Sequence, residues 1–301
     1  MTMRAIERTS PGGVKTWRGE AMALRVGGAL LTTLVWIGAI VCIFPLVWMV
    51  VSSFRPDQSF IVSPFPTTFQ EFTLSNYGSI FSLGTFPSGF QNSAIQVVII
   101  LATTLLFCPL AGFGFAKFAF RGQRVLFGLM MLTLFFVPLT QYIPLLIEMN
   151  AIGWLDTYQA LVLPLVITSF GVFFMTGAIR AIPDELLQAA RIDGCGHVRT
   201  WWRIVMPLIL PAQVSLAVVT FLTSYNDYFW PLLVLRSPSM LTIQIDLALL
   251  SSDPRMPSVA ATSNFGPYLA GCTLVILPTV IIFLVMQRYF LRGVLQGGIK
   301  G

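Results

Sequence analysis

The side chains that could do chemistry are few in this chain of 301 residues, of which 10% are charged. Asp227, which follows Asn226, is the one acid inside a long apolar run. A carboxylate at bilayer depth costs at least ~2.5 kcal/mol unless it is paired or hydrated, and such groups usually face a cavity. Asp227 therefore indicates either a polar path through the protein or a hydrogen bond to a neighbouring helix end.

Other polar residues on the apolar runs could line the path that Asp227 indicates. Sugars suit such a lining, because hydroxyl groups need paired donors and acceptors while aromatic faces hold the ring carbons. The predicted translocation path consists of Asn92, Gln141, Tyr142, Ser224, Asn226 and Asp227.

Nothing in the sequence predicts catalysis, a metal centre or a cofactor. His197 is the only histidine, and it has no serine or carboxylate arrangement around it. No G-x-x-x-x-G-K-S/T sequence is present to hold nucleotide phosphates. The cysteines have no metal-ligand spacing, so we expect them to act as small apolar residues. They are Cys42, Cys108, Cys195 and Cys272.

The elements that must position these residues are predicted to be membrane-spanning helices. Hydrophobic residues make up 56% of the chain, and its mean hydropathy is +0.81. A helix needs about 20 apolar residues to cross about 30 Å of hydrocarbon. Six runs reach this length, at about residues 26–51, 94–116, 125–147, 159–179, 212–235 and 268–287. We therefore predict an all-α membrane protein with six transmembrane helices.

The basic residues predict how these helices are oriented. Of the 18 Lys and Arg residues, all except Arg55, Arg236 and Arg255 lie on one side of the predicted spans. Basic residues collect on the cytoplasmic side, so we expect both termini in the cytoplasm, as an even number of spans also requires. The net charge of +6 is therefore a topology signal and not a nucleic-acid footprint.

One predicted cytoplasmic loop is distinctive, and residues 181–211 read AIPDELLQAARIDGCGHVRTWWRIVMPLILP. Pro183 suits the first position of a helix, where its missing N–H costs nothing. Asp184 and Glu185 then place negative charge at the positive end of that helix. The leucines, alanines and isoleucine that follow give the helix a short apolar surface of small residues.

The second half of this loop predicts a turn and a further short helix. Gly194 can adopt the left-handed conformation that ends a helix. A second helix, at about residues 198–205, leads to Pro207, where the next span begins. The loop is thus predicted to be a helix–turn–helix outside the membrane, with an apolar stripe that docks in a partner's groove.

This loop resembles the cytoplasmic signature of binding-protein-dependent ABC importer permeases. The signature has Ala-Ala, three residues, Gly, nine residues and then Ile-x-Leu-Pro. The matching residues are Ala189, Ala190, Gly194, Ile204 and Pro207. Gln188 stands where the family usually has Glu, and Met206 stands where it usually has Leu. Met for Leu is nearly neutral in volume, whereas Gln for Glu removes a charge that could form a salt link to the ATPase.

Further segments narrow the resemblance to the carbohydrate-uptake branch of that family. The end of the chain resembles the second permease of maltose-type systems, and the other segments agree in the same order along the sequence. These segments are residues 45–55, 92–93, 153–158, 182–186, 192–194, 226–232 and 287–301.

The resemblance implies a type I ABC importer permease in the inner or plasma membrane of a bacterium or archaeon. Such a subunit moves a sugar or oligosaccharide by alternating access. The implied partners are a second, homologous permease that forms a heterodimer, two ATPase subunits that carry ATP and Mg, and an extracytoplasmic solute-binding protein. Lipid surrounds the assembly. We therefore expect no enzymatic activity in this chain itself.

The resemblance also implies which parts of the chain carry out each role. A cytoplasmic segment at 1–25 precedes a permease domain at 26–290 with a coupling loop at 181–207, and a cytoplasmic tail follows at 291–301. The implied ATPase-coupling residues are Glu185, Gln188, Ala189, Ala190, Asp193, Gly194, Ile204, Met206 and Pro207. The implied tail residues near the ATPase are Gly297, Gly298, Lys300 and Gly301.

Two alternatives remain open at the level of the sequence. An ABC permease for a glycerol-phosphate-type solute would keep the resemblance and change the substrate. A secondary transporter would require an inverted repeat and charged or discontinuous half-helices at the membrane midplane. The sequence has no such repeat and a single acid within its spans, which disfavours the second alternative.

Overall fold

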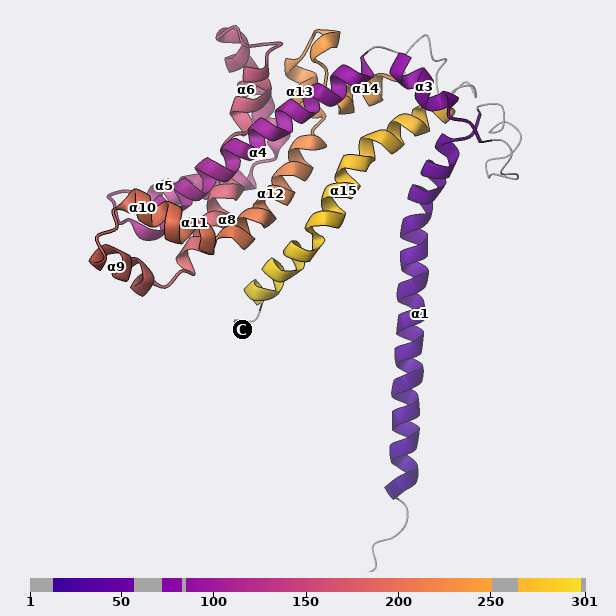
Figure 1. Ribbon diagram of the computed structural model, residues 1–301, viewed down its shortest axis with the longest axis horizontal. Helices are drawn as coiled ribbons and strands as arrows, with labels where there is room; N and C mark the ends of the chain where they lie inside the picture. Colours follow the sequence, from indigo (N-terminus) through magenta and orange to yellow (C-terminus); the bar gives the residue numbers. More distant parts are fainter. Residues whose placement is uncertain (1–12, 57–71, 83–84, 251–264, 299–301) are drawn as a thin grey trace, which may run out of the picture. The chain divides into compact units, whose positions relative to one another are not determined.

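The structure is a computed structural model that describes residues 13–56, 72–82, 85–250 and 265–298, with side chains between residues 28 and 287 of these ranges. Every regular element in these ranges is a helix, which confirms the all-α prediction (Figure 1). The elements are α1 (Gly13–Ser53), α3 (Ser75–Ser82), α4 (Phe86–Lys117), α5 (Gln123–Leu132), η2 (Thr133–Phe135), α6 (Pro138–Ala151), α7 (Tyr158–Val162), η3 (Leu163–Leu165), α8 (Ser169–Arg180), α9 (Asp184–Ile192), α10 (His197–Thr200), η4 (Trp201–Val205), α11 (Met206–Leu208), α12 (Leu210–Tyr225), α13 (Phe229–Val234), η5 (Pro238–Met240), α14 (Ile243–Leu250) and α15 (Phe265–Gly298).

The chain divides into two compact units, Met1–Ser52 and Ser53–Gly301. The first unit consists of α1, whose stretch Gly28–Ser53 has a mean hydropathy of 2.6 over its most apolar residues. A single helix cannot bury its own apolar side chains, so this stretch needs lipid or a partner around it. At 26 residues it is long enough to cross a bilayer.

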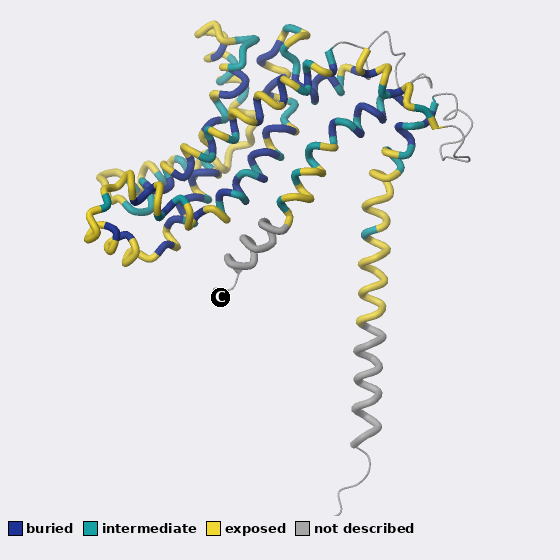
Figure 2. Tube along the Cα trace, in the orientation of Figure 1, coloured by how far each residue is buried: buried dark blue, intermediate teal, exposed yellow. Residues whose placement is uncertain are grey.

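In the second unit α4 is the central helix. Its 32 residues extend about 48 Å at 1.5 Å per residue. Helices α8, α12 and α14 pack against it, and buried residues gather where α4, α8 and α12 lie side by side (Figure 2). Gly112 permits the α4–α8 contact, because a Cβ atom at this position would lie 2.9 Å from the backbone nitrogen of Thr176. Helix α15 packs against α12, α14 and α3.

The third apolar run, predicted as one helix at 125–147, is broken. Gln123–Phe135 and Pro138–Ala151 meet at 107°. The break spans Phe136 and Val137, which both have an extended backbone, with φ −64° and ψ 127° at Val137. Val137 precedes Pro138, and the proline ring disfavours a helical conformation in the residue before it.

The fifth run, predicted as one helix at 212–235, is also interrupted. Helix α12 ends at Tyr225, residues 226–228 are not helical, and the short helix α13 follows. At its other end, Leu210–Tyr225 meets His197–Leu208 at 74°. The prolines at positions 207 and 211 flank this second bend, where their missing N–H groups remove helix hydrogen bonds.

The remaining runs agree better with the predicted spans. Tyr158–Arg180 joins α7, η3 and α8 into one apolar stretch, and Phe86–Lys117 and Phe265–Gln287 are single helices. Within the described residues, four helices are long and apolar enough to cross a membrane, or up to six if each bent pair is one span.

Candidate functional site

The predicted coupling loop, residues 181–207, begins with α9. Pro183 is the N-cap of this helix, with φ −57° and ψ 136°, so it precedes the first helical position in which it was predicted. Asp184 and Glu185 occupy the first turn, where their carboxylates lie near the positive end of the helix dipole. The predicted charge arrangement is therefore present.

Helix α9 has a buried and an exposed face. Leu187 and Ala190 are buried, and Leu187 belongs to the apolar cluster that contains Trp201. Residues three and four positions apart share one face of a helix. The exposed face contains Glu185, Gln188, Ala189 and Ile192. The exposed apolar stripe is thus narrower than predicted, because Leu187 and Ala190 are buried against the rest of the chain.

The turn after α9 is a Schellman motif around Gly194. The backbone nitrogen of Cys195 donates to the carbonyl of Ala190 at 2.9 Å, and that of Gly194 donates to Arg191 at 3.0 Å. Gly194 has φ +76°, which confirms the predicted left-handed conformation. No atom lies within 4 Å of a Cβ built on Gly194. Glycine is therefore required by the backbone conformation and not by the space around it.

The return half of the loop is less regular than predicted. In place of one helix at 198–205 it contains α10, a π-helical turn η4 and the three-residue α11. Trp201 is buried, with its ring centroid 5.2 Å from that of Phe113 on α4. Ile204 and Met206 are half-buried and Pro207 is exposed. The packing of Trp201 on α4 explains why this half of the loop lies against the protein.

Lys117, the last residue of α4, joins that helix to the start of α9. Its ammonium group donates to the carbonyl of Ile182 and to Oδ1 of Asp184, both at 2.7 Å. The Lys117 side chain is only 8% exposed, whereas that of Asp184 is 71% exposed. In the sequence, Lys117 counts only as one of the basic residues that predict topology. Its contact with Asp184 has no sequence pattern, because the two residues are 67 positions apart along the chain.

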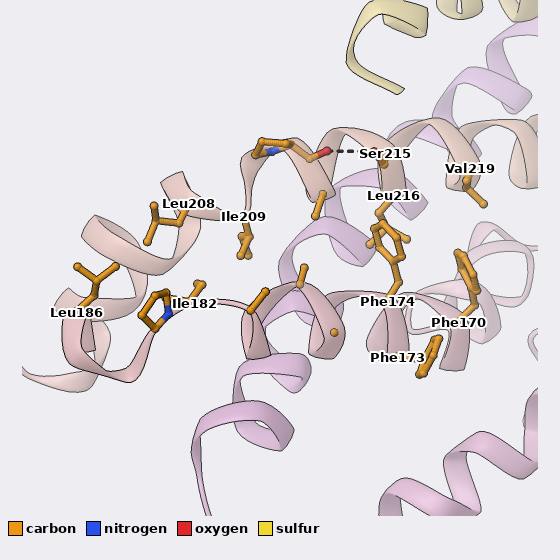
Figure 3. A pocket seen from close by; sticks show the side chains of 16 residues that line it. Phe170, Phe173, Phe174, Ile182, Leu186, Leu208, Ile209, Ser215, Leu216 and Val219 are labelled. Atoms are coloured by element: carbon orange, nitrogen blue, oxygen red, sulfur yellow. Dashed lines mark hydrogen bonds between the residues drawn. The ribbon is translucent and has the colours of Figure 1, made fainter. Parts of the chain in front are cut away.

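An apolar groove of about 890 Å³ lies between α8 and α12 (Figure 3). Phe170, Phe173 and Phe174 of α8 form one wall, and Leu216 of α12 lies opposite (Figure 3). Ser215 is the one polar side chain of the lining, and its hydroxyl donates to the carbonyl of Pro211 at 3.1 Å. The side chains of the groove are thus almost all apolar, and the predicted path residues do not line it.

Two of the predicted path residues lie around Trp230 of α13. The Tyr142 ring on α6 is 5.5 Å from the Trp230 ring between centroids. Oδ1 of Asp227 accepts a hydrogen bond from the backbone nitrogen of Trp230 at 3.4 Å. The sequence left two interpretations of Asp227 open. This contact agrees with the second, a hydrogen bond to a helix end, and the helix is α13, which directly follows Asp227.

Asn92 is a buried bridge between three segments. Its Nδ2 donates to the carbonyls of Ser239 at 2.9 Å and Leu241 at 2.8 Å. Its Oδ1 accepts from the hydroxyl of Tyr158 at 2.6 Å. Tyr158 and Tyr142 pack against the same apolar cluster, so Asn92 lies at the edge of the region that holds Trp230.

The other predicted path residues differ in exposure. Ser224 is buried, and Gln141 and Asn226 are exposed. The Nδ2 group of Asn226 donates to the carbonyl of Leu222 at 2.8 Å. The structure therefore brings Tyr142 and Asp227 together and leaves Gln141 and Asn226 on the surface of this chain.

Two acids that were not predicted as site residues contact or belong to the segment that follows α13. Asp156 accepts hydrogen bonds from the backbone nitrogens of Arg236 at 2.9 Å and Ser237 at 3.0 Å, and from the Ser237 hydroxyl. These bonds, with that from the Ser237 hydroxyl as the strongest, lower the pKa of Asp156 below its ordinary value of 3.8. Asp246 of α14 is buried against Gly89 of α4, and burial raises its pKa to about 7.

The tail residues lie at the limit of the described chain. Gly297 and Gly298 are the last residues of α15, and Lys300 and Gly301 lie outside the described residues. In the described part of the chain, no group of three or more His, Cys, Asp or Glu side chains could hold a metal ion.

Comparisons with known proteins give one consistent result. Residues 108–296 match the family described as binding-protein-dependent transport system inner membrane component. The chain is 34% identical to an arabinooligosaccharides transport system permease protein of Halalkalibacterium halodurans, over 87% of this chain and 93% of that protein. It is 30% identical to a trehalose/maltose transport system permease protein of Thermococcus litoralis, over 87% and 93%.

A solved structure shares the fold. It is described as a bacterial ABC transporter involved in the import of the acidic polysaccharide alginate, and the match has a TM-score of 0.79 over 88% of this chain and 97% of that chain. The sequence identity is 23%, so this likeness is evidence for the architecture alone.

Proposed function

Because the chain belongs to the family of binding-protein-dependent transport system inner membrane components, we propose that it is the subunit through which a sugar or oligosaccharide crosses the inner membrane in an ABC importer. The chain is a multi-pass membrane permease, and its relatives are transport permeases and not enzymes. The relatives named for arabinooligosaccharides and for trehalose/maltose match almost the whole chain, which supports a carbohydrate as the solute.

The observation that carries the proposal is the exposed face of α9. Glu185, Gln188 and Ala189 are presented outward on a helix that is fixed at its end by the turn at Gly194. A face of this kind suits a groove in a separate ATPase subunit. Two ATPase subunits with bound ATP and Mg, a second permease and an extracytoplasmic binding protein complete the proposed importer. We assign the tail after α15 to the same ATPase side.

The proposed topology has six spans with both termini in the cytoplasm. The bent pairs α5–α6 and α11–α12 each count as one span in this arrangement. The charge distribution supports it, since Lys117, Arg121 and Arg180 would lie on the cytoplasmic side and Arg236 outside. The helices α3 and α14 then belong to the outer face, where the binding protein delivers its solute.

The proposed sugar path passes Tyr142 and Asp227. An aromatic face and a carboxylate can hold the ring carbons and a hydroxyl group of one sugar unit. Asn92, in contrast, uses its side-chain amide for contacts within the protein. In this proposal it positions neighbouring segments and does not contact the sugar.

The test is reconstitution of the chain in lipid vesicles with the ATPase, second permease and binding protein of the proposed importer. Uptake of maltose, trehalose, arabinooligosaccharides and glycerol 3-phosphate is measured with and without ATP. We expect ATP-dependent uptake of a sugar. Uptake of glycerol 3-phosphate alone would select the alternative substrate, and uptake by the purified chain without nucleotide would contradict the proposal.

A further inference from the structure

We propose that Lys117 is a positioning residue that attaches the coupling helix α9 to α4, and that α4 passes movement of α9 to the outer segment 239–246. This inference rests on the proposed function. It assigns the link between the ATPase side and the solute side of the importer to one helix and to named contacts at its two ends.

The cytoplasmic contact is short and directional. Lys117 donates to two acceptors on either side of Pro183, the carbonyl of Ile182 and the carboxylate of Asp184, both at 2.7 Å. The ammonium group lies at the carboxyl end of α4 and Asp184 lies at the amino end of α9, so each charge also suits the dipole of its own helix. The contact therefore fixes both the distance and the angle at which α9 begins.

Few other contacts attach α9 to the rest of the unit. No helix among the described elements packs extensively against it. Its inward contacts are those of Leu187 and Ala190, which are apolar and have no preferred direction. The bridge from Lys117 to Asp184 is the one ion pair in the part of the chain that the structure describes. Apart from the chain connection to α8 at residues 181–183, this bridge is thus the directional contact through which a pull on α9 reaches α4.

The opposite end of α4 holds the outer segment just as directly. Asn92 binds the carbonyls of Ser239 and Leu241, and the hydroxyl of Ser93 accepts from the backbone nitrogen of Ile243 at 2.9 Å. Asn92 and Lys117 are 25 residues apart on one uninterrupted helix, or about 38 Å at 1.5 Å per residue. Although Pro109 lies within α4, the helix continues through it without a non-helical residue, so displacement at Lys117 displaces the residues that hold 239–243.

The neighbouring helices are not equivalent to α4. The third and fifth runs bend by 107° and 74°, so they change direction between the two sides. Helix α8 ends at Arg180, and residues 181–183 join it to α9, but the Arg180 guanidinium lies over the Phe127 ring at 5.4 Å. Among the described helices, α4 is thus the one whose side chains make polar contacts with both the coupling loop and the outer segment.

The experiment compares three variants in the complete complex with the ATPase, second permease and binding protein. Lys117→Met keeps the apolar stem and removes the charge, and Lys117→Arg keeps the charge. Arg121→Met removes a cation from the exposed loop that follows and serves as the matched control. The readouts are ATPase co-purification, solute moved per ATP hydrolysed, and the nucleotide-dependent change in labelling of Ser239→Cys by a membrane-impermeant maleimide.

We expect Lys117→Met to retain the ATPase and to move at least about fivefold less solute per ATP, since coupling between sites is typically worth that much or more. The nucleotide-dependent change in labelling at position 239 should be lost. Lys117→Arg keeps the cation at this contact, and Arg121→Met removes an exposed charge, which contributes little. Both variants should stay within about twofold of the parent.

Wild-type solute per ATP and wild-type labelling in Lys117→Met would overturn the inference while the proposed function stands. Loss of the ATPase from Lys117→Met would also overturn it, because Lys117 would then be needed for assembly and not for transmission. A parent complex that neither retains an ATPase nor transports solute would overturn the proposed function and the inference together.

Discussion

At the scale of single residues, Gly194 is the position where one substitution should have the largest effect on coupling. A side chain at φ +76° costs roughly 1–2 kcal/mol, although the space around it is open. We expect Gly194→Asp to leave the spans inserted and to weaken ATPase co-purification and substrate-stimulated ATP turnover, since the Schellman turn that ends α9 would unwind.

Gly196 supplies the matched control for this prediction. It lies two positions further on, with φ −70° and open space for a Cβ. Gly196→Asp adds the same bulk and charge to the same loop and should behave as the parent does. Wild-type ATPase binding and turnover in Gly194→Asp would mean that this loop does not transmit the motion.

Gln188 is one of the two positions at which the loop departs from the signature that it resembles. Its side chain lines a polar pocket of about 240 Å³ with Lys117, Asp184 and Arg191. In Gln188→Glu the attraction to Arg191 offsets the repulsion from Asp184, each a few tenths of a kcal/mol, and Lys117 adds a further attraction. We expect α9 to remain intact and the ATPase contact to be preserved or tightened, with greater sensitivity to salt.

The measurement is retention of the ATPase on the purified complex as salt is raised. Gln188→Met is the control, because it keeps the length of the side chain without charge. If Gln188→Glu lost the ATPase at low salt, the departure from the family pattern would be a requirement of this particular complex.

At the scale of elements, Asp156 controls how the segment after α13 is held. Hydrogen bonds lower the pKa of Asp156 in the folded state below 3.8. Its stabilising contribution is thus complete above the unfolded-state pKa and is lost as pH falls through the lower folded-state value. Between pH 5 and 8 we expect no pH dependence from this group, and below about pH 4 residues 236–237 should loosen.

Hydrogen exchange at residues 236 and 237 across this pH range is the measurement. Asp156→Asn is the control, since it keeps an acceptor and tolerates the positive φ of 61°, but it does not titrate. Equal acid sensitivity of the parent and Asp156→Asn would assign the loosening to another group.

The junction of α4 and α14 depends on a glycine. A Cβ atom on Gly89 would collide with the Asp246 carboxylate and lie 3.3 Å from Cα of Ile243. We expect Gly89→Ala to destabilise the protein by about 1–3 kcal/mol through overpacking, measured as a lower midpoint of thermal unfolding in detergent. Gly128→Ala in α5 meets no atom within 4 Å and should be neutral or stabilising. Equal midpoints would mean that α14 can shift without cost.

At the scale of the whole molecule, the orientation of the spans can be tested with reporter fusions. Fusions after Arg124 and after Ser239 should report the cytoplasm and the outer side, respectively. A fusion after Gly153 is the most informative of the three, because it reports the outer side only if the bent pair α5–α6 crosses the membrane as one span. A cytoplasmic signal there would place the loop that contains α9 outside and remove the basis of ATPase docking.

The sequence by itself determined the all-α class, the apolar runs and the left-handed turn at Gly194. These properties are local: a continuous apolar run of about 20 residues is helical in lipid because a helix satisfies its backbone hydrogen bonds within the segment, and a glycine after an amphipathic helix ends it. The charge asymmetry likewise needs no tertiary information. The predicted residue pattern of the loop 181–207 was sufficient to indicate the family before any contact was known.

The structure decided how sharply the runs bend at their prolines, and only the tertiary structure decided which polar groups meet. Val137 and Asn226 interrupt helices that hydropathy alone reads as continuous, since hydropathy does not register backbone conformation. The contacts of Lys117 with Asp184, and of Asn92 with Ser239 and Leu241, join residues 67, 147 and 149 positions apart. Such pairings depend on how helices pack, and no local pattern of one chain encodes them.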